Sequence, residues 1–368
     1  MNKLALMSLS GAVLVAIVGC NSDSGSGGSN SPEKRTSARS GMELNPSTDA
    51  AELSQLFAGS LGGDLPGGSS VGDLPIVATT LEARSSQPSN NAGVLFTELM
   101  TQIELVNEQR QRNLYARNGE EPNFGDMFEQ LCETGSASYS QTDTLVSLDF
   151  SNCRTDLGSE GEIRITGGLS VAASSGNLDN AISDTCTDES ISATFKADDL
   201  WYRFYDGSGN RVESVFIAAD VTFSADEDCA AKTTSSSVSG PYFFVNVEGD
   251  WFGFYNFGFS VSLDESNASN PLTEGSVDFT FDSSELTGSL TIETTQDFAA
   301  FQDPGYPHAG EMKIRSGNNE LVYTFPNLID SPDPESEQVT ITGRSDQSQV
   351  CQGQSSWAQM NNGQASCN

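Results

Sequence analysis

His308 is the first residue to consider for catalysis, because it is the only histidine in the 368-residue chain. A Ser-His-Asp arrangement requires a histidine as general base. This one lies in the Pro- and Gly-rich stretch 304–310, which is typical of a turn, and neither a G-x-S-x-G elbow nor a phosphate-binding Gly-rich loop accompanies it. Paired carboxylates suffice for glycoside hydrolysis, but no spacing singles out two of the 51 acidic residues. We therefore predict that the chain is not an enzyme.

The stretch 206–210, Asp-Gly-Ser-Gly-Asn, places oxygen ligands at alternate positions, as the start of an EF-hand calcium loop does. The rest of that pattern fails, since Arg211 stands where the glycine belongs and Ile217 where the bidentate glutamate belongs. We predict a hairpin loop there, and a solvated loop for the acidic residues 226–228. No CxxC pair is present for a zinc site, so we expect no metal and no cofactor.

Binding chemistry is indicated by residues 242–259, which contain nine aromatic side chains. The pattern predicts two strands joined by a turn at 248–250. With a period of two, Trp251, Tyr255, Phe257, Phe259, Val261 and Leu263 would share one face, and Phe252 and Phe254 would begin the other. A strand that is apolar on both faces needs cover on both. Either a helix or a bound apolar molecule would supply it, and the candidate ligand contacts are Tyr242, Phe244, Phe252 and Phe254.

The elements that position these residues are predicted to be mainly β. Apolar residues alternate with polar ones from about residue 137 onward, as at Val277, Phe279 and Phe281, which is typical of antiparallel sheet with one solvated face. About ten or eleven strands without crossover helices predict a meander, either a large curved sheet or a partly closed barrel.

One long helix is predicted over residues 92–118, with Phe96, Leu99, Ile103 and Val106 at helical spacing and Gly119 after its end. A shorter helix is predicted over 126–132. Both are candidates to pack on the sheet. We take residues 92–368 as a single helix-plus-β domain.

The amino terminus contains Lys3 followed by an apolar run of about 15 residues, which is typical of an export signal and too short for a transmembrane helix. The run ends in Ile17-Val18-Gly19-Cys20, which resembles the lipobox of bacterial lipoproteins. The resemblance implies cleavage of residues 1–19 and lipidation of Cys20. It also implies an outer-membrane location, because Asn21 replaces the Asp that resembles an inner-membrane retention signal in enterobacterial lipoproteins. The alternatives are the periplasmic face of the inner membrane, or an ordinary secretory peptide with a chance cysteine.

Residues 20–91 are rich in Ser, Gly and Pro and contain few aromatic residues, a composition that cannot form a core alone. We predict a flexible tether here. Within it, Leu53, Leu56, Phe57 and Leu61 follow helical spacing after the N-cap types Ser47, Thr48 and Asp49. These residues predict a short helix that either lies on the folded domain or docks a partner.

Apart from Cys20, the chain has six cysteines, and an even number in an exported chain predicts disulfides. Sequential pairing closes local loops, so we predict Cys132 with Cys153, Cys186 with Cys229, and Cys351 with Cys367.

The formal charge of −34, from 17 basic and 51 acidic residues, argues against nucleic acid as a partner, because binding to phosphate depends on Lys and Arg. The hypothesis that follows is a lipid-anchored envelope protein that binds a phospholipid, fatty acid or hydrocarbon and passes it to or from an envelope transporter. Its general plan resembles that of the half-barrel lipoprotein chaperones. The alternative is a structural or adhesive surface lipoprotein without a small-molecule ligand.

Overall fold

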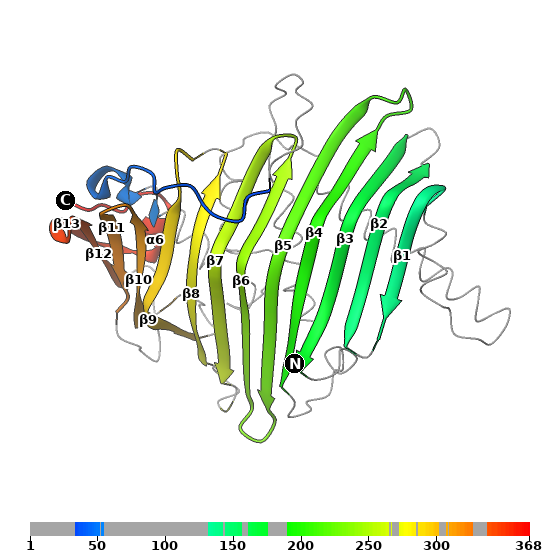
Figure 1. Ribbon diagram of the computed structural model, residues 1–368. Helices are drawn as coiled ribbons and strands as arrows, with labels where there is room; N and C mark the ends of the chain where they lie inside the picture. The colour runs from blue at the N-terminus through cyan, green and yellow to red at the C-terminus, as the bar shows by residue number, and fades with distance from the viewer. Residues whose placement is uncertain are drawn as a thin grey trace.

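A single antiparallel sheet of 13 strands makes up most of the described part of the chain (Figure 1). The computed structural model describes residues 34–51, 53–54, 132–142, 144–156, 161–175, 190–264, 266, 272–284, 286–301, 307, 309–326 and 337–368. The strands are paired in chain order, so the sheet is a meander, and β1 and β13 are its two edges. The prediction of a mainly β meander is confirmed, and its form is an open, curved sheet.

The strands are β1 Thr134–Gln141, β2 Leu145–Asp156, β3 Glu162–Ser175, β4 Ile191–Tyr205, β5 Arg211–Asp228, β6 Thr233–Val247, β7 Asp250–Asp264, β8 Leu272–Ser283, β9 Leu290–Phe301, β10 Ala309–Ser316, β11 Asn319–Thr324, β12 Gln338–Ser345 and β13 Ser348–Ser356. The helix α6, Trp357–Asn361, follows the last strand.

The number of strands, 13, corrects the predicted ten or eleven. The two edge strands account for the difference. β1 (TGSASYSQ) and β13 (SQVCQGQSS) have almost no apolar alternation, because an edge strand with few buried side chains needs none. Their backbones pair with β2 and β12, which a hydrophobic pattern does not reveal.

Two faces of the sheet follow from the alternation along β5. We call the face that carries Val215, Ile217 and Ala219 the core face, because these residues belong to the main hydrophobic cluster. The opposite face, here called the second face, carries Phe216 and Ala218, which form a separate small cluster with Phe244.

The long helix predicted over 92–118 and the shorter one over 126–132 lie outside the described residues, apart from Cys132 itself. The helical residues that are described are 46–51, 53–54 and α6. In α6, Ser356 caps the first turn through a capping box with Gln359, and Trp357 and Met360 are buried in the main cluster.

Residues 34–54 lie against the sheet, so the tether predicted for 20–91 is interrupted here. In Figure 1 this blue segment runs from beside β6 and β7 toward β11–β13. Gly41 forms a parallel bridge with Ser289, and Ser316 donates a hydrogen bond to the Met42 carbonyl. Ser54 Oγ lies 3.2 Å from Tyr323 Oη. We call residues 34–54 the strap.

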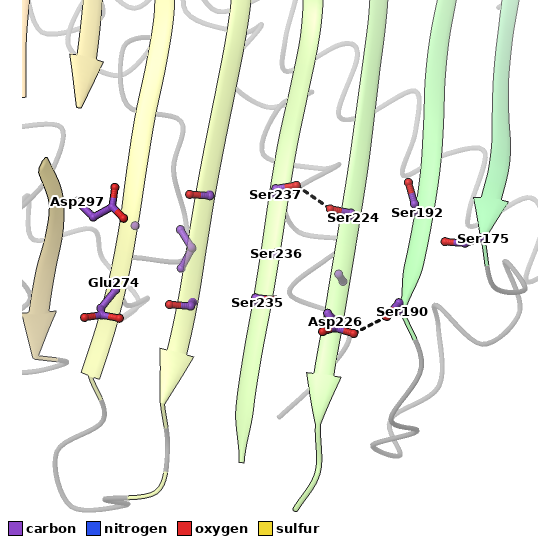
Figure 2. A pocket seen from close by; sticks show the side chains of 15 residues that line it. Ser175, Ser190, Ser192, Ser224, Asp226, Ser235, Ser236, Ser237, Glu274 and Asp297 are labelled. Carbon is purple, nitrogen blue, oxygen red and sulfur yellow. Dashed lines mark hydrogen bonds between the residues drawn. The ribbon is translucent and has the colours of Figure 1, made fainter. Parts of the chain in front are cut away.

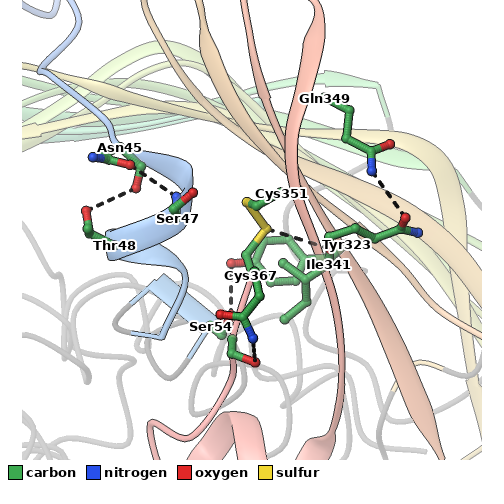
Figure 3. Close-up of a disulfide and its surroundings, with 12 residues drawn as sticks. Asn45, Ser47, Thr48, Ser54, Tyr323, Ile341, Gln349, Cys351 and Cys367 are labelled. Carbon is green, nitrogen blue, oxygen red and sulfur yellow. Dashed lines mark hydrogen bonds between the residues drawn. A yellow bond between two sulfur atoms is a disulfide. The ribbon is translucent and has the colours of Figure 1, made fainter.

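Two of the predicted disulfides are confirmed, Cys132–Cys153 and Cys351–Cys367. Figure 3 shows the second one between the strap helix and β12, beside Tyr323 and Ile341. Cys229 is also disulfide-bonded, while Cys186, its predicted partner, lies outside the described residues. Gly343 permits the close packing at this corner, because a Cβ there would lie 2.4 Å from Cys351 Sγ and 2.6 Å from Pro46 Cβ.

Candidate functional site

The four predicted ligand contacts do not share one face of the sheet. The β6–β7 hairpin turns at Glu248 and Gly249, as predicted, and both residues have a positive φ, at 53° and 111°. This register pairs Phe243 with Phe254 and Val245 with Phe252. Phe252 and Phe254 therefore lie on the core face, and Tyr242 and Phe244 lie on the second face.

On the core face, Phe252 is only 5% exposed and belongs to the main hydrophobic cluster. Phe254 is half-buried and packs against that cluster. Its ring centroid lies 6.1 Å from that of Phe252 and 5.5 Å from those of Phe279 and Phe281. Phe252 is thus part of the core, whereas Phe254 keeps part of its ring accessible.

On the second face, four aromatic rings from adjacent strands form a row. They are Trp201 on β4, Phe216 on β5, Phe244 on β6 and Trp251 on β7. Phe244 is 1% exposed, and its neighbour Tyr242 lies under the ammonium group of Lys34, 5.3 Å from the ring centroid. Phe244 is thus fully used by packing, whereas Tyr242 is half-buried and contacts the strap through Lys34.

A β-bulge at Asn256 explains why the period-two prediction for β7 was wrong beyond that residue. Asn256 has φ 48°, and the register against β8 shifts between Tyr255 and Gly258. Phe257 and Phe259 consequently join Phe252 and Phe254 at the core face, since Phe257 is in the main cluster and Phe259 packs against it. Asn adopts positive φ more readily than most residues, so an Asn inside an aromatic strand is the sequence signal for such a bulge.

The core face carries more aromatic surface than the four predicted residues. Six phenylalanine side chains are only partly buried and pack at the margin of the main cluster: Phe150, Phe195, Phe204, Phe223, Phe254 and Phe259. They come from β2, β4, β5 and β7. We take this set of rings on the core face as the candidate apolar site and call it the half-buried phenylalanine surface; within it, Phe254 and Phe259 both contact Phe279.

A comparison with family models, curated proteins and solved structures finds no match to this chain.

The second face is polar at the end of the long strands that lies away from the turn at Glu248 and Gly249. Figure 2 shows the pocket at this end. An open groove of about 480 Å³ lies there, and its lining includes Ser192, Ser224, Ser237 and Ser260 together with Asp226, Glu274 and Asp297. The serines come from the serine-rich run SSSVSG in β6 and from the alternating sequence FSVSLD in β7. Sequence reasoning treated these positions as the solvated side of the sheet and missed the groove.

Glu213 is the one described carboxyl group with a pKa shifted close to neutrality. It pairs with Phe204 across the β4–β5 ladder, which places it on the core face, and it is 8% exposed. Burial raises the pKa of the Glu213 carboxyl to about 7, and the negative charge of Glu248 adds to the shift. Ionisation of Glu213 above about pH 7 is therefore expected to destabilise the folded sheet.

The predicted solvated loop at 226–228 is corrected, because these residues form the end of β5 and pair with residues 233–235 of β6. The remaining candidates from the sequence lie as follows. Residues 206–210 form the loop of the β4–β5 hairpin, in which Asp206 accepts hydrogen bonds from the backbone N–H groups of Ser208 and Asn210. His308 and Cys20 lie outside the described residues. Within the described residues, no group of three or more His, Cys, Asp or Glu side chains is arranged to hold a metal ion. No helix among them is long and apolar enough to cross a membrane.

Proposed function

We propose that this chain is a lipid-anchored cell-envelope protein that binds an apolar ligand and assists its uptake or its transfer between membranes. The ligand is a phospholipid, a fatty acid or a hydrocarbon. The observation that supports this proposal is the set of six half-buried phenylalanine side chains on the core face. In the proposed cell envelope, the acyl chains on Cys20 hold the protein at the outer membrane, and an envelope transporter receives or supplies the ligand.

The energetic basis is the apolar surface that these rings leave accessible. Removing apolar surface from water contributes about 25 cal/mol per Å², and an aromatic side chain presents roughly 150–250 Å². An acyl chain laid over several half-buried rings would therefore gain several kcal/mol without any polar contact. Extended apolar surface of this kind is typical of binding sites for apolar molecules or partners.

A second function, a structural or adhesive surface lipoprotein, is favoured by different residues. Phe252 and Phe244 are 5% and 1% exposed, so these two aromatic side chains are fully used by packing within the protein. If the other six phenylalanine residues are similarly needed only to close the core, the protein has no site for a ligand.

Substitution of half-buried rings distinguishes the two functions. We expect Phe254→Ser combined with Phe259→Ser to weaken the binding of a fluorescent fatty acid by at least about tenfold, since each ring contributes roughly 1 kcal/mol or more of buried contact. The matched control is Val350→Ser, which removes a 50% exposed apolar side chain on β13 and should leave binding unchanged. Circular dichroism checks that both variants fold. Equal binding by the wild type and a folded double variant would contradict the proposal.

Phe252→Asp provides the comparison within the same strand. Because Phe252 is buried in the main cluster, an unpaired carboxylate there is expected to unfold the protein. Urea titration followed by tryptophan fluorescence measures this. A Phe252→Asp protein that still unfolds cooperatively would show that position 252 is accessible to water.

A further inference from the structure

The groove on the second face is built from two parallel rows of polar side chains that run across the strands. In the first row, Ser192, Ser224, Ser237, Ser260 and Ser276 are direct cross-strand partners from β4 to β8. Ser224 and Ser237 are hydrogen-bonded at 2.6 Å, and Ser260 and Ser276 at 2.7 Å. These bonds hold four of the hydroxyl groups in two pairs, and Ser192, Ser224, Ser237 and Ser260 line the groove.

The second row begins and ends in a carboxylate. Asp226 on β5 pairs with Ser235, Ser235 with Ser262, and Ser262 with Glu274 on β8. Figure 2 shows Asp226 and Glu274 on opposite sides of the groove, with Ser235 between them. Three inter-strand spacings separate the two carboxylate positions, which is roughly 14 Å at the usual spacing of neighbouring strands.

The residues between the two rows, Ala225, Ser236, Val261 and Gly275, also line the groove. Because successive side chains in a strand point to opposite faces, these residues contribute backbone to its floor. The groove is therefore shallow and elongated across the strands, and its volume of about 480 Å³ is within the range of small-molecule sites.

The charge of the lining selects the ligand. Asp226, Glu274 and Asp297 are carboxylates, and no Lys, Arg, His or aromatic residue is among the 15 lining residues. Serine hydroxyls accept as well as donate, whereas carboxylates only accept. The site therefore favours a ligand that brings positive charge and many hydrogen-bond donors, and it has no ring on which a sugar could stack.

We propose that this groove binds a linear polyamine, with one terminal ammonium group at Asp226, the other at Glu274, and the intervening amines on the hydroxyls of Ser235 and Ser262. Ser190 donates a hydrogen bond to Asp226 Oδ1 and holds this carboxylate in place. The site is on the opposite face from the half-buried phenylalanine surface, so it is independent of the proposed apolar ligand.

Calorimetric titration of the mature protein with spermine at low salt tests this assignment. We expect Asp226→Asn combined with Glu274→Gln to weaken spermine binding by about tenfold, since two exposed ion pairs contribute up to about 1 kcal/mol each. Ser235→Ala combined with Ser262→Ala keeps the charge and should weaken binding by about two- to threefold through lost hydrogen bonds.

The matched control is Glu133→Gln combined with Asp346→Asn, which removes the same two charges from exposed positions just before β1 and in the β12–β13 turn. It should change the affinity by less than about twofold if the groove is the site. Equal weakening by both charge-removing double variants would mean diffuse attraction to an acidic protein and would overturn the proposal. Binding of an uncharged oligosaccharide that spermine does not displace would overturn it as well.

Discussion

Replacing Arg39 by Met is expected to lower the free energy of unfolding by about 3–5 kcal/mol, because it leaves a buried carboxylate without its partner. Asp282 has a fully buried side chain, and Arg39 Nη2 lies 2.7 Å from its Oδ1. The Arg39 backbone N–H donates to Oδ2 at 2.7 Å, and the guanidinium also donates to the carbonyl groups of Ser283 and Leu286. The hydrogen bonds to Asp282 also raise the pKa of the guanidinium.

The matched control is Arg35→Met. Arg35 and Arg39 both lie over the Trp251 ring, at 4.4 and 4.9 Å from its centroid, so both substitutions remove a cation from the same aromatic ring. Arg35 forms no ion pair with the described residues, and its loss should cost less than about 1 kcal/mol. Chemical denaturation of the three proteins measures the difference. Similar losses for Arg35→Met and Arg39→Met would show that the pair with Asp282 does not hold the strap.

Glu213→Gln is expected to stabilise the protein at pH 8 and to have little effect at pH 4.5. The folded-state pKa of about 7 exceeds the ordinary value of 4.5, so the folded state binds more protons than the unfolded state between these values. The stabilising contribution is complete below about pH 4.5 and is lost as the pH rises through 7. A shift of this size corresponds to about 3 kcal/mol.

Thermal or urea unfolding of wild type and Glu213→Gln from pH 4.5 to 8 measures this contribution. Because the whole chain is strongly acidic, part of any loss at high pH comes from general repulsion, and the exposed substitution Glu133→Gln estimates that part. A difference between wild type and Glu213→Gln that stays constant across this range would show that Glu213 does not titrate near neutrality.

The central strands were predictable from the sequence because their side chains alternate strongly. Phe279 and Phe281 alternate with Asp278 and Asp282 in β8, and a buried face allows only one register for such a pattern. The hairpin turn at Glu248 and Gly249 was also predictable from the sequence. A two-residue turn with positive φ at both positions is typical of Gly-containing dipeptides.

The strap was not predictable, because its stabilising contacts are with distant residues. Arg39 and Asp282 are separated by 243 positions, and the Ser- and Gly-rich composition around the strap is typical of a linker. A short helix near Leu53 was predictable, but its start was placed too late: it begins at residue 46, and the Ser47 N–H donates to Asn45 Oδ1. The contact between Ser54 and Tyr323 had no signal in the sequence.

The candidate site was predictable only in part. The aromatic stretch correctly indicated where the largest rings gather, but the hairpin register divides Tyr242 and Phe244 from Phe252 and Phe254. The half-buried rings of Phe195 and Phe223 belong to other strands and become neighbours of this surface only in the sheet. The groove was missed because a serine on the polar side of a strand is common and gives no signal by itself. The alignment of five such serines across β4 to β8 is visible only from the strand register.

Native mass spectrometry of the mature protein, extracted from the envelope in which it is made, bears most directly on the proposed carrier function. We predict a population whose extra mass leaves as an intact lipid or hydrocarbon on collisional activation, while the acyl chains on Cys20 stay attached. A protein that carries only its covalent chains, and that takes up nothing from phospholipid vesicles or fatty acid added afterwards, would contradict the carrier function and favour an anchored structural protein.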